Sequence, residues 1–156
     1  MDLLAVIAEA VQASSFGAWA RQSSLAYPAA NLVHLLGLVM LVGGIGLVDL
    51  RLAGLFRALP AEALSRALTP IALSGLVLMV LSGPVMFAAD AAALAGSGAF
   101  RWKLLLIALA LANAAAFRLL WRGRLADPPP PARAMALASL LLWLGIATLG
   151  RMIAYS

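Results

Sequence analysis

Hydrophobic residues dominate four long stretches of the chain, and few charges interrupt any of them. The stretches run over residues 28–50, 70–89, 102–121 and 134–153. A helix that crosses a bilayer needs about 20 mostly apolar residues, and each stretch supplies that length. The short connections between them favour up-and-down connectivity within one unit. The pattern predicts an all-α fold, an integral membrane four-helix bundle forming a single transmembrane domain over residues 1–156.

The segment before the first stretch is amphipathic. Leu4, Ile7 and Val11 recur at helical spacing on one face, and Glu9 lies on the other. A helix with an apolar and a polar face lies in the plane of the membrane interface. We therefore expect an N-terminal interfacial amphipathic helix over about residues 3–20.

Prolines and small residues mark the connections. Pro60 and Pro70 bound a segment that reads as a short surface helix. Small residues fill 88–100, which predicts a loop, and the proline-rich run 124–133 predicts a stiff polyproline linker. Pro84 lies inside the second stretch and should kink it near its end.

Composition agrees with a membrane setting and excludes one class of partner. Of the 156 residues, 65% are hydrophobic and 11% are charged, against about 25% charged in soluble domains. The net charge is +5, but no basic face with interleaved aromatic residues is available to hold a phosphate backbone. We expect no nucleic acid partner. The expected partners are the lipid bilayer and either another membrane protein or a second copy of the chain.

The basic residues are unevenly shared between the two ends of the stretches. Seven lie in or beside the links that follow the first and third stretches, and four lie at the opposite ends. The seven are Arg51, Arg57, Arg66, Arg118, Arg122, Arg124 and Arg133, and the four are Arg21, Arg101, Lys103 and Arg151. Positive residues favour the cytoplasmic side. The expected location is a bacterial inner (cytoplasmic) membrane, multi-pass, with both termini in the periplasm.

The chain holds no cysteine and a single histidine, His34. Disulfides, thiolate metal sites and covalently attached c-type haem are therefore excluded. An ionisable residue inside a span is by default a functional hypothesis. Gly37, Leu41 and Gly44 share the helical face of His34, and these glycines leave room for a flat ring or a second backbone.

Helix order places several polar and sulfur-bearing residues in one layer. His34 lies near the start of the first span, and Met86 lies near the end of the second. Arg101 and Lys103 open the third span, and Arg151 lies near the end of the fourth. With up-and-down connectivity, all five residues meet at the same end of the bundle.

One arrangement uses this layer as a cofactor site for haem b. His34 serves as an axial ligand, and the second ligand is Met86, Met79 or Met152, or the iron stays five-coordinate. The residues assigned to pair with the propionates are Arg101, Lys103 and Arg151. Such a protein would serve electron transfer or cofactor handling.

Two other hypotheses use the same residues. In the first, His34, Met79 and Met86 bind copper, because imidazole and thioether ligands suit Cu(I), and the protein is a copper-handling permease component. In the second, the protein is a non-catalytic membrane scaffold or accessory subunit. There His34 hydrogen-bonds between helices, the methionines pack, and Arg101 and Lys103 reach toward headgroups. No residue is assigned a catalytic role, and enzymatic activity is left open.

Two polar residues lie elsewhere in the spans. Asp49 lies near the end of the first span, and we expect it to pair with Arg118 or Arg122 on another element. Asn113 lies near the middle of the third span, where a hydrogen bond to a neighbouring helix is the expected role.

A signature spread over the first span resembles that of uncharacterised bacterial four-helix membrane proteins. It consists of Tyr27-Pro28, His34, Gly43-Gly44 and Asp49-Leu50-Arg51. The resemblance implies the same architecture, points to His34 and supplies no reaction.

Two more distant likenesses concern cofactors. His34 with Gly37, the run Trp102–Leu106 and Asn113 are similar to the CopD-like copper-resistance membrane domain, which implies copper. The combination of His34 and Lys103 is similar to HemJ-type protoporphyrinogen oxidases. In that family a His and a Lys matter for haem b binding and activity, which implies haem b here.

Overall fold

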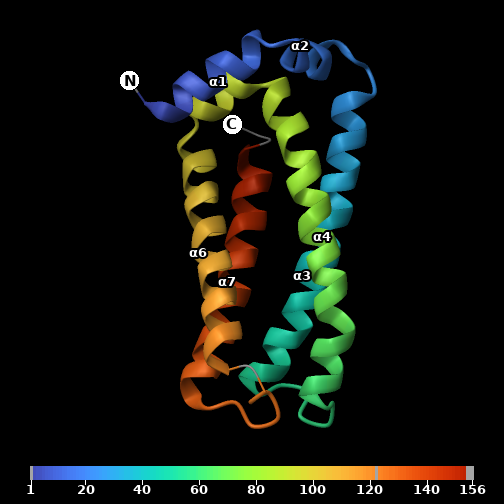
Figure 1. The fold of residues 1–156 in the computed structure, drawn as a ribbon, viewed down its shortest axis with the longest axis vertical. Coiled ribbons are helices and arrows are strands. Elements are labelled where there is room, and N and C mark those ends of the chain that lie inside the picture. The colour runs from blue at the N-terminus through green and yellow to red at the C-terminus, as the bar shows by residue number, and fades with distance from the viewer. Residues whose placement is uncertain (1, 122, 154–156) are drawn as a thin grey trace.

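Seven helices make up the computed structural model, which describes residues 2–121 and 123–153. They are α1 Leu3–Ala13, α2 Ser15–Gln22, α3 Ala26–Ala53, α4 Ala61–Ala89, α5 Ala91–Gly96, α6 Gly98–Trp121 and α7 Pro130–Ile153. The long helices α3, α4, α6 and α7 stand side by side, and α1 and α2 lie across one end of them (Figure 1). We call this end the cap end, and the opposite end, formed by residues 54–60 and 123–129, the loop end.

The four long helices are each long and apolar enough to cross a bilayer, which identifies a membrane protein by length and composition. The all-α prediction is confirmed, since no strand occurs in the described residues. Two boundaries were wrong. Helix α7 begins at Pro130, so the last four residues of the linker expected over 124–133 are helical. Helix α4 begins at Ala61, so the segment expected as a separate surface helix before Pro70 is its first part. Helix α4 continues through both Pro70 and Pro84.

The predicted interfacial helix over 3–20 is two helices with a bend of 71° between α1 and α2. Ser14 stands at the bend. Its hydroxyl donates to the carbonyl of Val11 at 2.6 Å and accepts from the N–H of Gly17 at 3.1 Å, so it ends one helix and caps the next. The expected loop at 88–100 also contains a short helix, α5.

Polar bonds tie the cap helices to each other and to α5 and α6. Arg101 at the start of α6 forms an ion pair with Asp2 at 2.5 Å. The side-chain oxygen of Gln12 accepts from the N–H of Ala92 at 2.9 Å. Arg21 on α2 donates to the carbonyl of Gln12 at 2.8 Å. These bonds hold the cap across the bundle.

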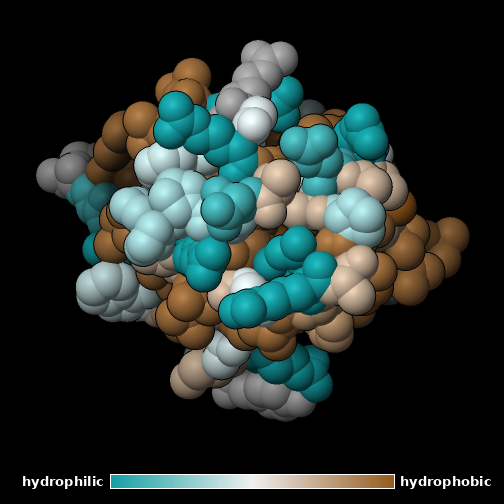
Figure 2. Space-filling model, turned by 90° about the horizontal axis from the view of Figure 1, so that it is seen from below, coloured by the Kyte–Doolittle hydropathy of each residue, from teal (hydrophilic) through white to brown (hydrophobic). Residues whose placement is uncertain are grey.

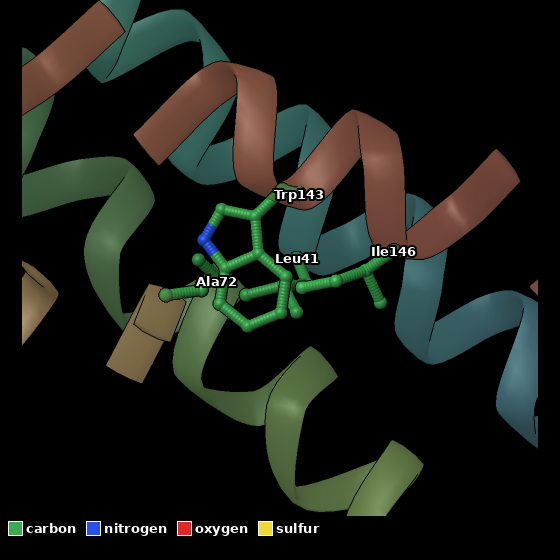
Figure 3. Packing of buried hydrophobic residues seen from close by; sticks show 5 residues of the cluster. Leu41, Ala72, Trp143 and Ile146 are labelled. Atoms are coloured by element: carbon green, nitrogen blue, oxygen red, sulfur yellow. The ribbon is translucent and has the colours of Figure 1, made fainter. Parts of the chain in front are cut away.

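The bundle consists of two helix pairs, α3 with α4 and α6 with α7, joined through contacts between α3 and α7. A central cluster unites all four helices: Leu41, Ala72, Ala110, Trp143 and Ile146. The indole of Trp143 reaches from α7 toward Leu41 and Ala72 (Figure 3). The remaining surface of the four helices is largely exposed and apolar, as expected for helices in lipid.

Helices α3 and α4 approach so closely that their backbones touch at paired glycines. A Cβ atom on Gly75 would lie 2.5 Å from the carbonyl oxygen of Gly37, and one on Gly44 would lie 3.0 Å from that of Leu68. The glycine face predicted on the first span is therefore a packing seam, as in other membrane helix pairs. This seam fixes where His34, one turn beyond Gly37, meets α4.

Candidate functional site in the cap-end half of the bundle

His34 on α3 is half-buried and bonds directly to α4. Its Nδ1 lies 3.0 Å from the hydroxyl oxygen of Ser82, which is buried. The same hydroxyl lies 2.7 Å from the carbonyl oxygen of Leu78, one turn earlier in α4. A chain of two hydrogen bonds thus links the imidazole to the backbone of α4.

We infer the proton positions from this hydrogen-bond network. A serine hydroxyl has one hydrogen, and the bond to the Leu78 carbonyl uses it because a carbonyl only accepts. Ser82 therefore accepts from His34, which places the imidazole proton on Nδ1. The other ring nitrogen, Nε2, then carries a lone pair. Metal-ligating histidines typically have this arrangement, in which one nitrogen donates to a protein acceptor and the other is left to bind.

Around His34, α4 carries one small residue, Gly83, and two thioether side chains, Met79 and Met86. A Cβ atom on Gly83 would lie 3.8 Å from Cε1 of the ring. Met79 and Met86 lie one turn to either side of Ser82 on α4. Met79 packs into the central cluster and against Gly37, whereas Met86 is half-buried nearer the cap.

A positive charge approaches the same region from the other helix pair. Lys103 on α6 is half-buried, and its Nζ would lie 3.3 Å from a Cβ atom placed on Gly150 of α7. Lys103 is therefore directed into the bundle rather than toward the headgroups.

The predicted layer is assembled at the cap end, but its members differ in their surroundings. Arg101 bonds Asp2 and donates from Nε and Nη2 to the carbonyl of Ala95, so the cap already engages it. Arg151 is exposed in the last turn of α7. His34 and Lys103 are the two polar members that face inward. Cofactor binding by these residues stays a prediction.

The acceptor of the His34 bond was missed by sequence reasoning. Ser82 shares a helical face with Met79 and Met86, so its periodicity was visible, but a serine in an apolar span reads as a packing residue. A shallow, largely apolar groove of about 410 Å³ between α2, α3 and α4 also reaches Ser82. The hydroxyl that orients His34 is therefore adjacent to the lipid-facing surface.

Asp49 forms a second polar site, nearer the loop end. The prediction that it pairs with Arg118 was wrong, and Arg122 lies outside the described residues. Asp49 is 6% exposed and lies close to Ser139 of α7, while its Oδ2 has no hydrogen-bond partner among the described residues. The neighbouring polar group is therefore a hydroxyl on α7 instead of the expected guanidinium of Arg118.

We expect a double-mutant cycle to detect this contact. Asp49→Ala and Ser139→Ala should each destabilise the bundle, with a coupling of about 0.6–1.7 kcal/mol, the range for polar contacts between membrane helices. Unfolding in mixed micelles, followed by circular dichroism, measures it. Asp49→Ala with Ser74→Ala, whose hydroxyl bonds only its own helix at Pro70, should give no coupling. Equal coupling in both cycles would contradict the contact.

The third span behaves as expected. Nδ2 of Asn113 donates to the carbonyl of Met135 on α7 at 3.0 Å, so the predicted bond to a neighbouring helix is confirmed.

Across the described residues, no group of three or more His, Asp or Glu side chains is placed to hold a metal ion. A metal bound at His34 would therefore take its other ligands from methionine thioethers or from a porphyrin ring.

Comparison with known proteins gives a family and no activity. A family model described as a family of unknown function (DUF6644) matches residues 9–156. No curated protein and no solved structure matches the chain. The likeness to CopD-like domains and HemJ-type oxidases therefore stays a hypothesis. Since the model covers all four long helices and His34, the chain belongs to the family DUF6644.

Proposed function

We propose that the protein binds haem b in the cap-end half of the bundle, with His34 as axial ligand, and serves electron transfer or haem handling. The observation that carries the proposal is the bond from Nδ1 of His34 to Ser82, which leaves Nε2 with a lone pair. Such a bond fixes the tautomer and the ring orientation that a ligand needs. When bound, haem would supply one-electron chemistry.

The surroundings fit this group. Lys103 brings a positive charge into the apolar bundle, where a propionate would form a charge-assisted bond with it. Gly83 and Gly150 present no side chain toward His34 and Lys103. Four residues in this region are only half-buried although each faces a neighbouring helix: His34, Gly83, Lys103 and Gly150. Arg101 and Arg151 at the cap end are the remaining propionate partners in this proposal.

The proposed location is a bacterial inner membrane with the cap end in the periplasm. Seven of the basic residues lie toward the loop end and four toward the cap end, which favours a cytoplasmic loop end. The cofactor would then lie near the periplasmic surface. A partner membrane protein or a second copy would exchange electrons or haem with it there.

Hemin titration of the purified protein tests the proposal. The wild type should bind one hemin per chain, and His34→Ala should weaken binding by more than about 100-fold, because even disturbing a ligand's partner costs 10–100-fold. Asn113→Ala is the matched control, since it removes one interhelical hydrogen bond elsewhere. Unchanged binding in His34→Ala, or equal loss in both variants, would refute ligation by His34.

Copper is the second candidate, favoured by the two methionines that flank Ser82 on α4. Imidazole with thioether is a suitable set for Cu(I). Titration with Cu(I) against a coloured chelator distinguishes it. Copper binding that disappears in His34→Ala and Met86→Leu, in a protein that binds no hemin, would replace the haem proposal. If the protein binds neither hemin nor Cu(I), the scaffold role remains, and the His34–Ser82 bond serves only to hold α3 against α4.

A further inference from the structure

A cavity of about 240 Å³ opens at the loop end, away from the His34 site. Three arginines line it: Arg51 from the last turn of α3, Arg57 from the following loop and Arg133 from the first turn of α7. Asp127 is the one acidic side chain in the lining. Hydrophilic residues gather over this end of the molecule (Figure 2).

Each guanidinium is fixed by a backbone carbonyl. Nε of Arg51 donates to Leu59 at 2.6 Å. Nε of Arg57 donates to Gly54 at 3.0 Å, and Nε of Arg133 donates to Pro128 at 2.9 Å. A guanidinium has five N–H donors, so one anchored Nε leaves the terminal groups available in a set orientation.

The positive charge of the cavity is not neutralised from within the described chain. Arg51 and Arg57 form no ion pair with any described carboxylate. Arg133 reaches Asp127 at 3.5 Å, but that carboxylate is 97% exposed, and exposed pairs are weak. The turn after α3 brings the arginines to this cavity. Gly54 ends α3 with a φ of 113°, which glycine adopts at little cost, and the chain then turns back toward α3.

We propose that this cavity binds a phosphate group. Planar guanidiniums bind phosphate oxygens through paired hydrogen bonds, and three of them surround a space large enough for the group. The cavity lies where α3 ends and α7 begins, at the level of lipid headgroups. The phosphate belongs either to an anionic lipid of the surrounding leaflet or to a soluble ligand. Basic pockets between membrane helices bind lipid headgroups in this way.

Thermal denaturation of the full-length protein in neutral detergent tests the proposal and separates the sources. One arm adds phosphatidylglycerol to the micelles, with phosphatidylcholine as blank. The other adds inorganic phosphate, with chloride at matched ionic strength as blank. Stabilisation in the first arm alone identifies a lipid headgroup, and stabilisation in the second identifies a soluble phosphate.

Variants tie the stabilisation to the cavity. Arg51→Gln with Arg133→Gln should weaken the apparent affinity, by about fivefold for each guanidinium removed. Arg66→Gln with Arg118→Gln removes the same charge from the same end without touching the cavity lining and should change little. If the first pair does not fold, Arg57→Gln alone should weaken affinity about fivefold. Equal losses in cavity and control variants, or no stabilisation in either arm, would overturn the proposal.

Discussion

Gly75→Ala is expected to destabilise the bundle more than alanine at any other glycine of the four long helices. The new Cβ would lie 2.5 Å from the carbonyl oxygen of Gly37, 2.7 Å from the backbone nitrogen of Leu41 and 2.8 Å from Cβ of Met40. Two of these atoms are backbone, so no side chain can rotate away. Helices α3 and α4 must separate along their whole seam.

We expect the free energy of unfolding to fall by about 3 kcal/mol, the upper end of ordinary overpacking. Separation of the helices also lengthens the 3.0 Å contact between His34 and Ser82, so hemin affinity should fall in parallel. Unfolding in mixed micelles measures the first effect, and hemin titration measures the second.

Gly43→Ala is the matched control for this variant. Gly43 lies on α3 as well, and a Cβ atom there would meet no atom within 4 Å. Alanine has the higher helix propensity by about 1 kcal/mol, so this variant should be as stable as the wild type or more stable. Similar losses for Gly43→Ala and Gly75→Ala would contradict the backbone seam between α3 and α4.

Ser82→Ala has the second large expected effect, on cofactor binding rather than on folding. Without the hydroxyl, Nδ1 of His34 loses its bond to Ser82, so the ring's tautomer and orientation are less firmly held. Loss of such a partner typically weakens metal binding 10–100-fold. Stability should fall by only about 0.6 kcal/mol, the average for a hydrogen bond between membrane helices. Hemin titration and unfolding of the same sample separate the two effects.

Ser74→Ala supplies the control on the same helix. The Ser74 hydroxyl bonds to the carbonyl one turn earlier, at Pro70, just as Ser82 bonds to Leu78. It lacks a partner on α3, so hemin affinity should be unchanged. Wild-type affinity in Ser82→Ala would show that His34 does not rely on this bond to act as a ligand.

The architecture was accessible from the sequence because span length and apolarity are local properties. The four spans and the cap-end placement of His34 follow from about 20 apolar residues per span and from helix order. The effect of proline on helix boundaries could not be predicted from the sequence in the same way. Pro70 reads as a helix end in isolation, but α4 packs against α3 on both sides of it, and that packing keeps the helix continuous.

Residue pairs across helices were the part that sequence could not supply. The glycine face of the first span predicted a seam, but the serine that meets His34 depends on the rotation and height of α4. Asp49 shows the same limit, since charge alone pointed to an arginine. The neighbouring group is a hydroxyl, Ser139 of α7, and its position depends on how α7 packs against α3.

The absorption spectrum of the hemin-loaded protein is the most direct test of ligation by His34. We expect a Soret band shifted from that of hemin in the same detergent. The shift should disappear in His34→Ala while circular dichroism stays unchanged. The same spectrum in the wild type and in His34→Ala would contradict it.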